Sequence, residues 1–192
     1  KRILPLGDSI TEGDPATYRY ELFRILTERG ANFDYVGSWQ HNPLPDTYTG
    51  SWDLDHEGHA GWTTEDIRDT LDAPTWLGAY TPDIALIHLG TNDIFGLEVA
   101  EDRDYSIANM RRIIDTLRIS NPRIEIYIAQ ILPISSNYEH EVEEGPIRPW
   151  NSWVTLYNRA LSALVLEIDS AQSPIRLVDM NSGFGNADLP DG

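Results

Sequence analysis

The stretch ILPLGDSIT, residues 3–11, opens the chain and decides how the rest of it is interpreted. An apolar run ends at Gly7, and a helical pattern begins shortly afterwards, near Thr17. Because the ligand sites of α/β folds lie beyond the carboxyl ends of parallel strands, Ser9 is predicted to stand at the mouth of a cleft. Taken alone, Gly-Asp-Ser also fits an ordinary turn in which Asp8 or Ser9 caps a helix.

Two later segments give this turn its meaning. The sequence GTND, residues 90–93, follows a second apolar run at 84–89, and HEGHAGW, residues 56–62, lies between the two turns. The three segments in this order resemble the SGNH (GDSL) hydrolase superfamily. The segment at 56–62 is similar, more particularly, to that of carbohydrate esterase family three, the acetylxylan esterases. The resemblance covers nearly the whole chain.

Composition limits the classes of function. A chain of 192 residues with 41% hydrophobic residues is expected to form one domain, residues 1–192, with a real core. Its 31 acidic and 14 basic residues give a formal net charge of −17, which disfavours nucleic acid and anionic lipid surfaces as partners. The absence of cysteine excludes disulfides and thiol catalysis. We expect a monomer.

The chain begins at Lys1, one residue before its first predicted strand and without a methionine. A removed secretory signal is one explanation and a trimmed boundary is the other, so a secreted, extracellular protein is the expectation. No run approaches the roughly 20 apolar residues that a membrane span needs.

Hydrophobic periodicity predicts alternating strands and helices, hence an α/β three-layer sandwich around a parallel sheet. The predicted helices cover residues 18–29, 63–71, 105–119 and 150–168, and the five predicted strands cover 3–6, 33–36, 82–89, 124–131 and 175–178. The regions 37–60 and 133–149 lack periodicity and are predicted to be functional loops. The resemblance adds a flavodoxin-like strand order, 2-1-3-4-5, for a central five-stranded sheet.

Ester hydrolysis needs a nucleophile, a base and donors for the developing oxyanion. The resemblance makes Ser9 the nucleophile and gives three oxyanion donors: the Ser9 N–H, the Gly61 N–H and the Asn92 amide, whose carbonyl oxygen a neighbour can hold. The alternative is that Gly61 is a loop hinge and Asn92 a turn residue. Asp8 and Asp93 are predicted to support the site by hydrogen-bonding loop N–H groups.

The general base is the difficulty. The resemblance implies an Asp-x-x-His pair near the carboxyl end, and Asp191-Gly192 looks like its beginning. The histidine would then fall at the second position beyond the last residue, so the domain looks cut short just before its catalytic histidine. We therefore predict Asp191 as the orienting acid. If this 192-residue chain is active, His56, His59 and His88 are the alternative bases.

No cofactor is expected. The cluster Asp53, Asp55, His56, Glu57 and His59 lacks the i, i+4 histidine spacing of zinc-protease helices, so no metal is predicted there. A structural calcium held by loop oxygens is possible but not predicted. His88 lies in an apolar run and is expected to be a satisfied core histidine.

Aromatic residues are abundant in the predicted loops, and flat rings suit sugar faces. Trp52, Asp53 and Trp62 are candidate substrate contacts. The resemblance implies acetylated xylan or its oligosaccharides as the substrate of a serine esterase that forms an acetyl-Ser9 intermediate. Two alternatives remain open: an esterase for another small acyl ester, a thioester or a lysophospholipid, and a non-catalytic carbohydrate-binding domain on the same scaffold.

Overall fold

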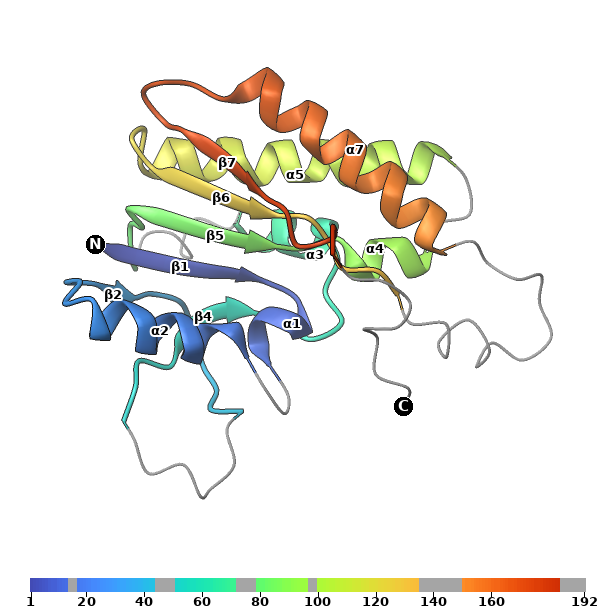
Figure 1. Ribbon diagram of the computed structural model, residues 1–192. Coiled ribbons are helices and arrows are strands. Elements are labelled where there is room, and N and C mark those ends of the chain that lie inside the picture. The colour runs from blue at the N-terminus through green and yellow to red at the C-terminus, as the bar shows by residue number, and fades with distance from the viewer. Residues whose placement is uncertain (14–16, 44–50, 72–78, 97–99, 135–149, 184–192) are drawn as a thin grey trace.

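The computed structural model describes residues 1–13, 17–43, 51–71, 79–96, 100–134 and 150–183 (Figure 1). Its strands are β1 (Arg2–Gly7), β2 (Asp34–Tyr35), β3 (Trp39–Gln40), β4 (Asp55–Gly58), β5 (Ile84–His88), β6 (Glu125–Ala129) and β7 (Ile175–Val178). Its helices are α1 (Ser9–Glu12), α2 (Tyr18–Glu28), α3 (Thr64–Leu71), α4 (Thr91–Gly96), α5 (Ala100–Ser120) and α7 (Trp150–Ile168).

The strands of the described residues form one seven-stranded sheet in the order β3-β4-β1-β5-β6-β7, with β2 also paired to β1. All pairs are parallel except β3 with β4. The predicted α/β fold with a mostly parallel central sheet is confirmed, whereas the count of five strands is wrong. The extra strands β3 and β4 lie in the region 37–60, which was predicted to be a loop. They could not be predicted because β3 is only two residues long and the polar sequence of β4, DHEG, shows no alternation of apolar and polar residues.

Alternate side chains of the central strands enter two separate cores. Leu4, Leu6 and Ile87 join the larger core with residues of α3, α5 and α7. Ile3 and Leu86 join a smaller aromatic core against Tyr20, Phe23 and Leu26 of α2. Helices therefore lie on both sides of the sheet, with α2 opposite α5 (Figure 1).

The long elements agree best with the predicted bounds. α7 and β7 occupy the residues predicted, whereas α5 begins at Ala100 and not near Tyr105. α1 was missed because four residues are too short to show a period. None of the helices in the described parts of the chain has the length and apolar composition to cross a membrane.

Candidate active site

Three neighbouring strands, β4, β1 and β5, end at the same edge of the sheet, and each is followed by one of the predicted site segments (Figure 1). Ser9 follows β1, Gly61 follows β4, and Asn92 follows β5. The parallel pairing of Gly7 with Gly58 and with His88 aligns the three strand ends. Segments far apart in the sequence therefore meet where an α/β fold places its ligands.

Ser9 is exposed and is the first residue of α1. Asp8 precedes it as the N-cap, and its buried carboxylate accepts a hydrogen bond from the Ile10 N–H at 3.0 Å. Among the described residues, neither the hydroxyl nor the backbone N–H of Ser9 has a hydrogen-bond partner. Both groups are thus available to a ligand.

The Asp8 carboxyl lies in an unusual electrostatic setting. Burial raises its pKa to about 6, and the charge of Asp93 acts in the same direction, while the Ile10 N–H and the Thr91 hydroxyl act against it. Asp8 therefore takes up a proton near neutral pH, although its carboxyl serves the turn and not the substrate.

Gly7 allows this turn to form. A Cβ at position 7 would lie 2.1 Å from the carbonyl oxygen of His88 and 2.4 Å from the Thr11 hydroxyl oxygen. Any other residue would push β1 away from β5 or displace α1. Glycine is therefore required at position 7, because the backbone of β5 comes too close to leave room for a side chain.

Gly61 lies in a four-residue turn, His59–Trp62, that three hydrogen bonds hold in place. The His59 N–H donates to Gly7 O at 3.0 Å, the Ala60 N–H to a Glu12 carboxylate oxygen at 2.6 Å, and the Trp62 N–H to His59 O at 3.2 Å. Gly61 itself has a φ of 81°, a conformation that favours glycine. Within the described residues its N–H has no acceptor, so the turn presents one unpaired donor.

Asn92 joins α4 to this turn. Its side-chain nitrogen Nδ2 donates to the carbonyl oxygen of Trp62 at 2.8 Å. The neighbour therefore holds the amide nitrogen, and not the carbonyl oxygen as expected. One N–H of the amide is used and the other remains for a ligand.

Asp93, the next residue, accepts hydrogen bonds from both the backbone N–H and the hydroxyl of Thr64, at 3.0 and 2.5 Å. This carboxylate caps the first turn of α3 and binds α3 to α4. Both acidic neighbours of the site residues thus bond to backbone N–H groups.

Two residues beside Gly61, Glu57 and His59, have a role that the sequence did not predict. His59 Nε2 lies 2.9 Å from a carboxylate oxygen of Glu57, which is fully buried and also accepts from the Ser38 N–H, the Ser38 hydroxyl and the Tyr80 hydroxyl. The His59 ring stacks on Trp62, with centroids 4.0 Å apart and planes at 16°. Glu57 and His59 of the segment HEGH carry the signal, but the sequence suggested a metal ligand for Glu57 and a metal ligand or an alternative base for His59.

Arg19 was missed altogether. Its side chain is fully buried, and all its hydrogen bonds to the described residues go to backbone carbonyl oxygens, those of Thr11, Glu12, His41 and Leu54, at 2.8–3.1 Å. The guanidinium thereby holds the carboxyl end of α1, the helix that Ser9 begins. No sequence signal distinguishes this arginine from a solvated one in the first turn of a helix.

Two of the three proposed substrate contacts, Trp52 and Asp53, have structural roles instead. Trp52 is only 9% exposed and packs edge-on against Tyr20 and Phe23 in the core under α2. Asp53 accepts hydrogen bonds from the Tyr35 and Asp55 N–H groups, so both of its oxygens serve the backbone.

Two tryptophans do lie at the site edge. Trp62 is half-buried against the larger core. Trp39 is 44% exposed beside His59, with centroids 5.4 Å apart.

The three alternative bases are all buried. The His56 ring accepts the Gly58 N–H at 2.9 Å, and burial lowers the pKa of His56 to about 3. Burial also lowers the pKa of His88 to about 4, and neither of its ring nitrogens bonds to a described residue, so it is not the satisfied histidine expected. In the described residues none of these rings bonds to the Ser9 hydroxyl. Asp191 lies outside the described residues.

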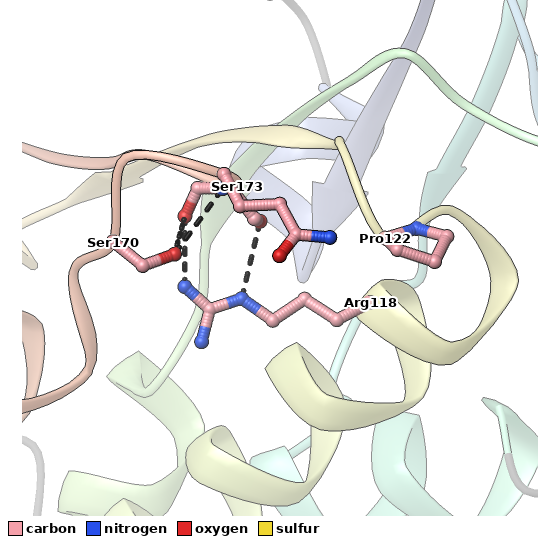
Figure 2. Close-up of a pocket in the computed structure, with 5 residues that line it drawn as sticks. Arg118, Pro122, Ser170 and Ser173 are labelled. Atoms are coloured by element: carbon pink, nitrogen blue, oxygen red, sulfur yellow. Dashed lines mark hydrogen bonds between the residues drawn. The ribbon is translucent and has the colours of Figure 1, made fainter.

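No group of three or more histidine, aspartate or glutamate side chains in the described residues is arranged to hold a metal ion. A pocket of about 240 Å³ lies at the opposite edge of the sheet, before β6 and β7, where Arg118 donates to Ser173 (Figure 2). The hydroxyls of Ser170 and Ser173 both donate to carbonyl oxygens. The pocket therefore lies between the end of α5 and the segment that connects α7 to β7. The hydroxyls of its two serines are engaged in these hydrogen bonds, so neither is a candidate nucleophile.

Comparison with known proteins places this geometry in a family. The sequence matches the GDSL-like lipase/acylhydrolase family over residues 6–189. A curated multidomain esterase of Ruminococcus flavefaciens is 31% identical over an alignment of 140 residues, and the match covers 63% of this chain and 17% of that protein. The chain thus spans about one sixth of the length of this curated relative.

Solved structures agree with the match. A carbohydrate esterase of family 3 from Talaromyces cellulolyticus has a TM-score of 0.80 and 28% identity, covering 99% of this chain and 85% of that one. A mutant acetyl esterase solved with an acetate ion has a TM-score of 0.79 and 27% identity, with the same coverage. A family 3 carbohydrate esterase of Clostridium thermocellum has a TM-score of 0.68 and 28% identity, covering 93% and 77%. The resemblance expected from the three motifs is confirmed.

Proposed function

The chain belongs to the GDSL-like lipase/acylhydrolase family, a family of ester hydrolases, and from this premise we propose that it is a serine esterase that removes acetyl groups from acetylated xylan or xylo-oligosaccharides. The observation that carries the proposal is the set of donors at the sheet edge where the exposed Ser9 lies. The Ser9 and Gly61 N–H groups have no acceptor in the described residues, and Asn92 has one amide hydrogen to spare. Ser9 and Gly61 are both exposed at the carboxyl edge of the sheet, so their N–H groups are free to bond to an oxyanion that forms beside Ser9.

In the proposed reaction, Ser9 Oγ attacks the acetyl carbonyl carbon while a histidine takes its proton. The carbonyl oxygen becomes an oxyanion bonded to the three donors. Collapse breaks the bond to the sugar oxygen, which leaves with the proton from the histidine, and water then hydrolyses the acetyl-Ser9 ester in the same way. We propose Asp191 as the acid that orients this histidine. No cofactor takes part in these steps.

Two features support a neutral carbohydrate. The net charge of −17 repels anionic substrates and suits an uncharged polysaccharide. The exposed indole of Trp39 lies beside the turn that presents Gly61, where a sugar attached to the acetyl group would extend. The acetyl esterase and the family 3 carbohydrate esterases among the similar structures act on substrates of the class that their names state, which favours the same class here.

The test is acetate release from acetylated xylan by the wild type, Ser9→Ala and a matched control, Ser152→Ala, which alters an exposed serine on α7. Ser9→Ala should lose all turnover and keep its sugar affinity, and the control should equal the wild type. Sugar binding without any ester hydrolysis, even in a chain continued through the expected histidine, would support a binding domain instead. Faster hydrolysis of longer acyl esters than of acetyl esters would contradict the acetyl specificity.

The role of Asp191 needs a second chain, continued so that a histidine stands at the second position after Gly192. Activity in the continued chain alone would support Asp191 as the orienting acid. Equal activity in both chains would contradict it, and substitution of His56, His59 and His88 in turn would then identify the base.

Substrate contact is tested with Trp39→Ala on two esters. The variant should raise KM for acetylated xylo-oligosaccharides several-fold and leave p-nitrophenyl acetate hydrolysis unchanged, because only the larger substrate reaches the indole. Tyr105→Ala removes an exposed aromatic ring from α5 and serves as the control. An unchanged KM for the oligosaccharide would remove Trp39 from the substrate site.

A further inference from the structure

The turn His59–Trp62 carries or holds two of the three proposed oxyanion donors. Gly61 belongs to it, and Asn92 is bound to its last carbonyl oxygen at 2.8 Å. The third donor, the Ser9 N–H, belongs to α1 and is fixed separately by the Asp8 cap. The relative position of the donors therefore depends on how rigidly this turn is held.

The buried carboxylate of Glu57 and the stacked rings of His59 and Trp62 hold the turn in place. The fully buried Glu57 carboxylate bonds to His59 Nε2 at 2.9 Å, and the His59 ring lies flat on the ring of Trp62. His59 and Trp62 are the first and last residues of the turn, so the stack clamps its two ends together. The carboxylate is in turn fixed by Ser38 and Tyr80.

Glu57 cannot easily move away from this arrangement. It lies on β4, opposite Leu6 of β1, so its backbone is part of the sheet. A carboxylate with no exposed surface is stable only while its donors remain in place. The hydrogen bond between Glu57 and His59 thus anchors the exposed turn to the sheet.

We propose that Glu57 and His59 are positioning residues that set the oxyanion donors Gly61 and Asn92. His59 holds the turn through its side chain, and the Trp62 carbonyl passes that position to Asn92. Neither Glu57 nor His59 touches the substrate in this account. The expected effect on kcat rests on the proposed esterase function, whereas the expected effect on the position of Gly61 and Asn92 does not.

The decisive variant is His59→Phe, which keeps a flat ring on Trp62 and removes the bond to Glu57. The matched control is His41→Phe, which makes the same change in an exposed histidine. His59→Gln is the conservative variant, because its amide can still donate to Glu57. If His59→Phe does not fold, Glu57→Gln tests the same bond from the other side.

The first readout is NMR of ¹⁵N-labelled protein, which needs no enzyme activity. The Gly61 backbone amide and the Asn92 side-chain amide should shift or broaden in His59→Phe and stay unchanged in His41→Phe. Wild-type positions for both resonances in folded His59→Phe would overturn the proposal.

The second readout is hydrolysis of p-nitrophenyl acetate. His59→Phe should lower kcat by about 10- to 100-fold with KM within about twofold of wild type, because misplaced donors act on the transition state. His59→Gln should lose less.

A double variant with Asn92→Ala should show less than the product of the two losses, because both changes affect the same donor. Full multiplication of the losses would overturn the proposed route through Trp62. Absence of activity both in this chain and in the chain continued through the expected histidine would refute the esterase function and leave the NMR result to decide the positioning role.

Discussion

The burial of His88 predicts a specific loss of stability in acid. The ring is 4% exposed at the end of β5, and burial lowers its pKa from 6.5 to about 4. The folded protein therefore holds the proton less tightly than the unfolded chain does. The stabilisation is complete above pH 6.5 and is lost as the pH falls from 6.5 towards 4.

The magnitude follows from the width of this window. One pKa unit corresponds to about 1.4 kcal/mol, so at about pH 4.5, two units below the unfolded pKa, His88 should have cost the folded state about 2.5 kcal/mol. His88→Gln cannot take up a proton and should escape this loss. The free energy of unfolding of the wild type should therefore fall by about 2.5 kcal/mol more than that of the variant between about pH 7.5 and about pH 4.5.

The assay is urea unfolding followed by the fluorescence of the six tryptophans, at both pH values. His56 titrates in the wild type and the variant alike, so its contribution cancels in the comparison. His41→Gln, which removes an exposed ring, should keep the wild-type pH dependence. Equal losses in the wild type and His88→Gln would refute the link between burial and acid sensitivity.

Further predictions concern the turns, the buried arginine and the buried aspartate. Gly61→Ala should cost about 1 kcal/mol because of its positive φ, seen as a lower Tm, whereas Gly7→Ala should prevent folding, because its Cβ would lie 2.1 Å from a carbonyl oxygen. Arg19→Met leaves four carbonyl oxygens without their donor and should lower the free energy of unfolding by more than about 3 kcal/mol in urea, and a smaller loss would show that water replaces the guanidinium. Because the raised pKa of Asp8 is about 6, the stability of the wild type should fall by about 2.5 kcal/mol relative to Asp8→Asn as the pH rises from about 4 to about 7, and parallel curves would contradict this.

The sequence determined the fold class, the long elements and the family. The helix at 150–168 and the strand at 175–178 could be predicted because long amphipathic and short apolar runs carry a clear period. The order of the turns at Ser9, Gly61 and Asn92 placed them at one sheet edge, because the carboxyl ends of parallel strands meet there.

Only the tertiary structure decided the parts played by single polar and aromatic side chains. Trp52 is apolar and Arg19 is charged, yet both are buried and the Arg19 guanidinium lies over the Trp52 ring, and nothing in the local sequence predicts this. The bond between Glu57 and His59 joins residues two apart, but it matters because Ser38 and Tyr80, distant in the sequence, complete the burial of the carboxylate. Local periodicity reports which face of an element is apolar, whereas the partner of a buried polar group is set by which segments the folded chain brings together.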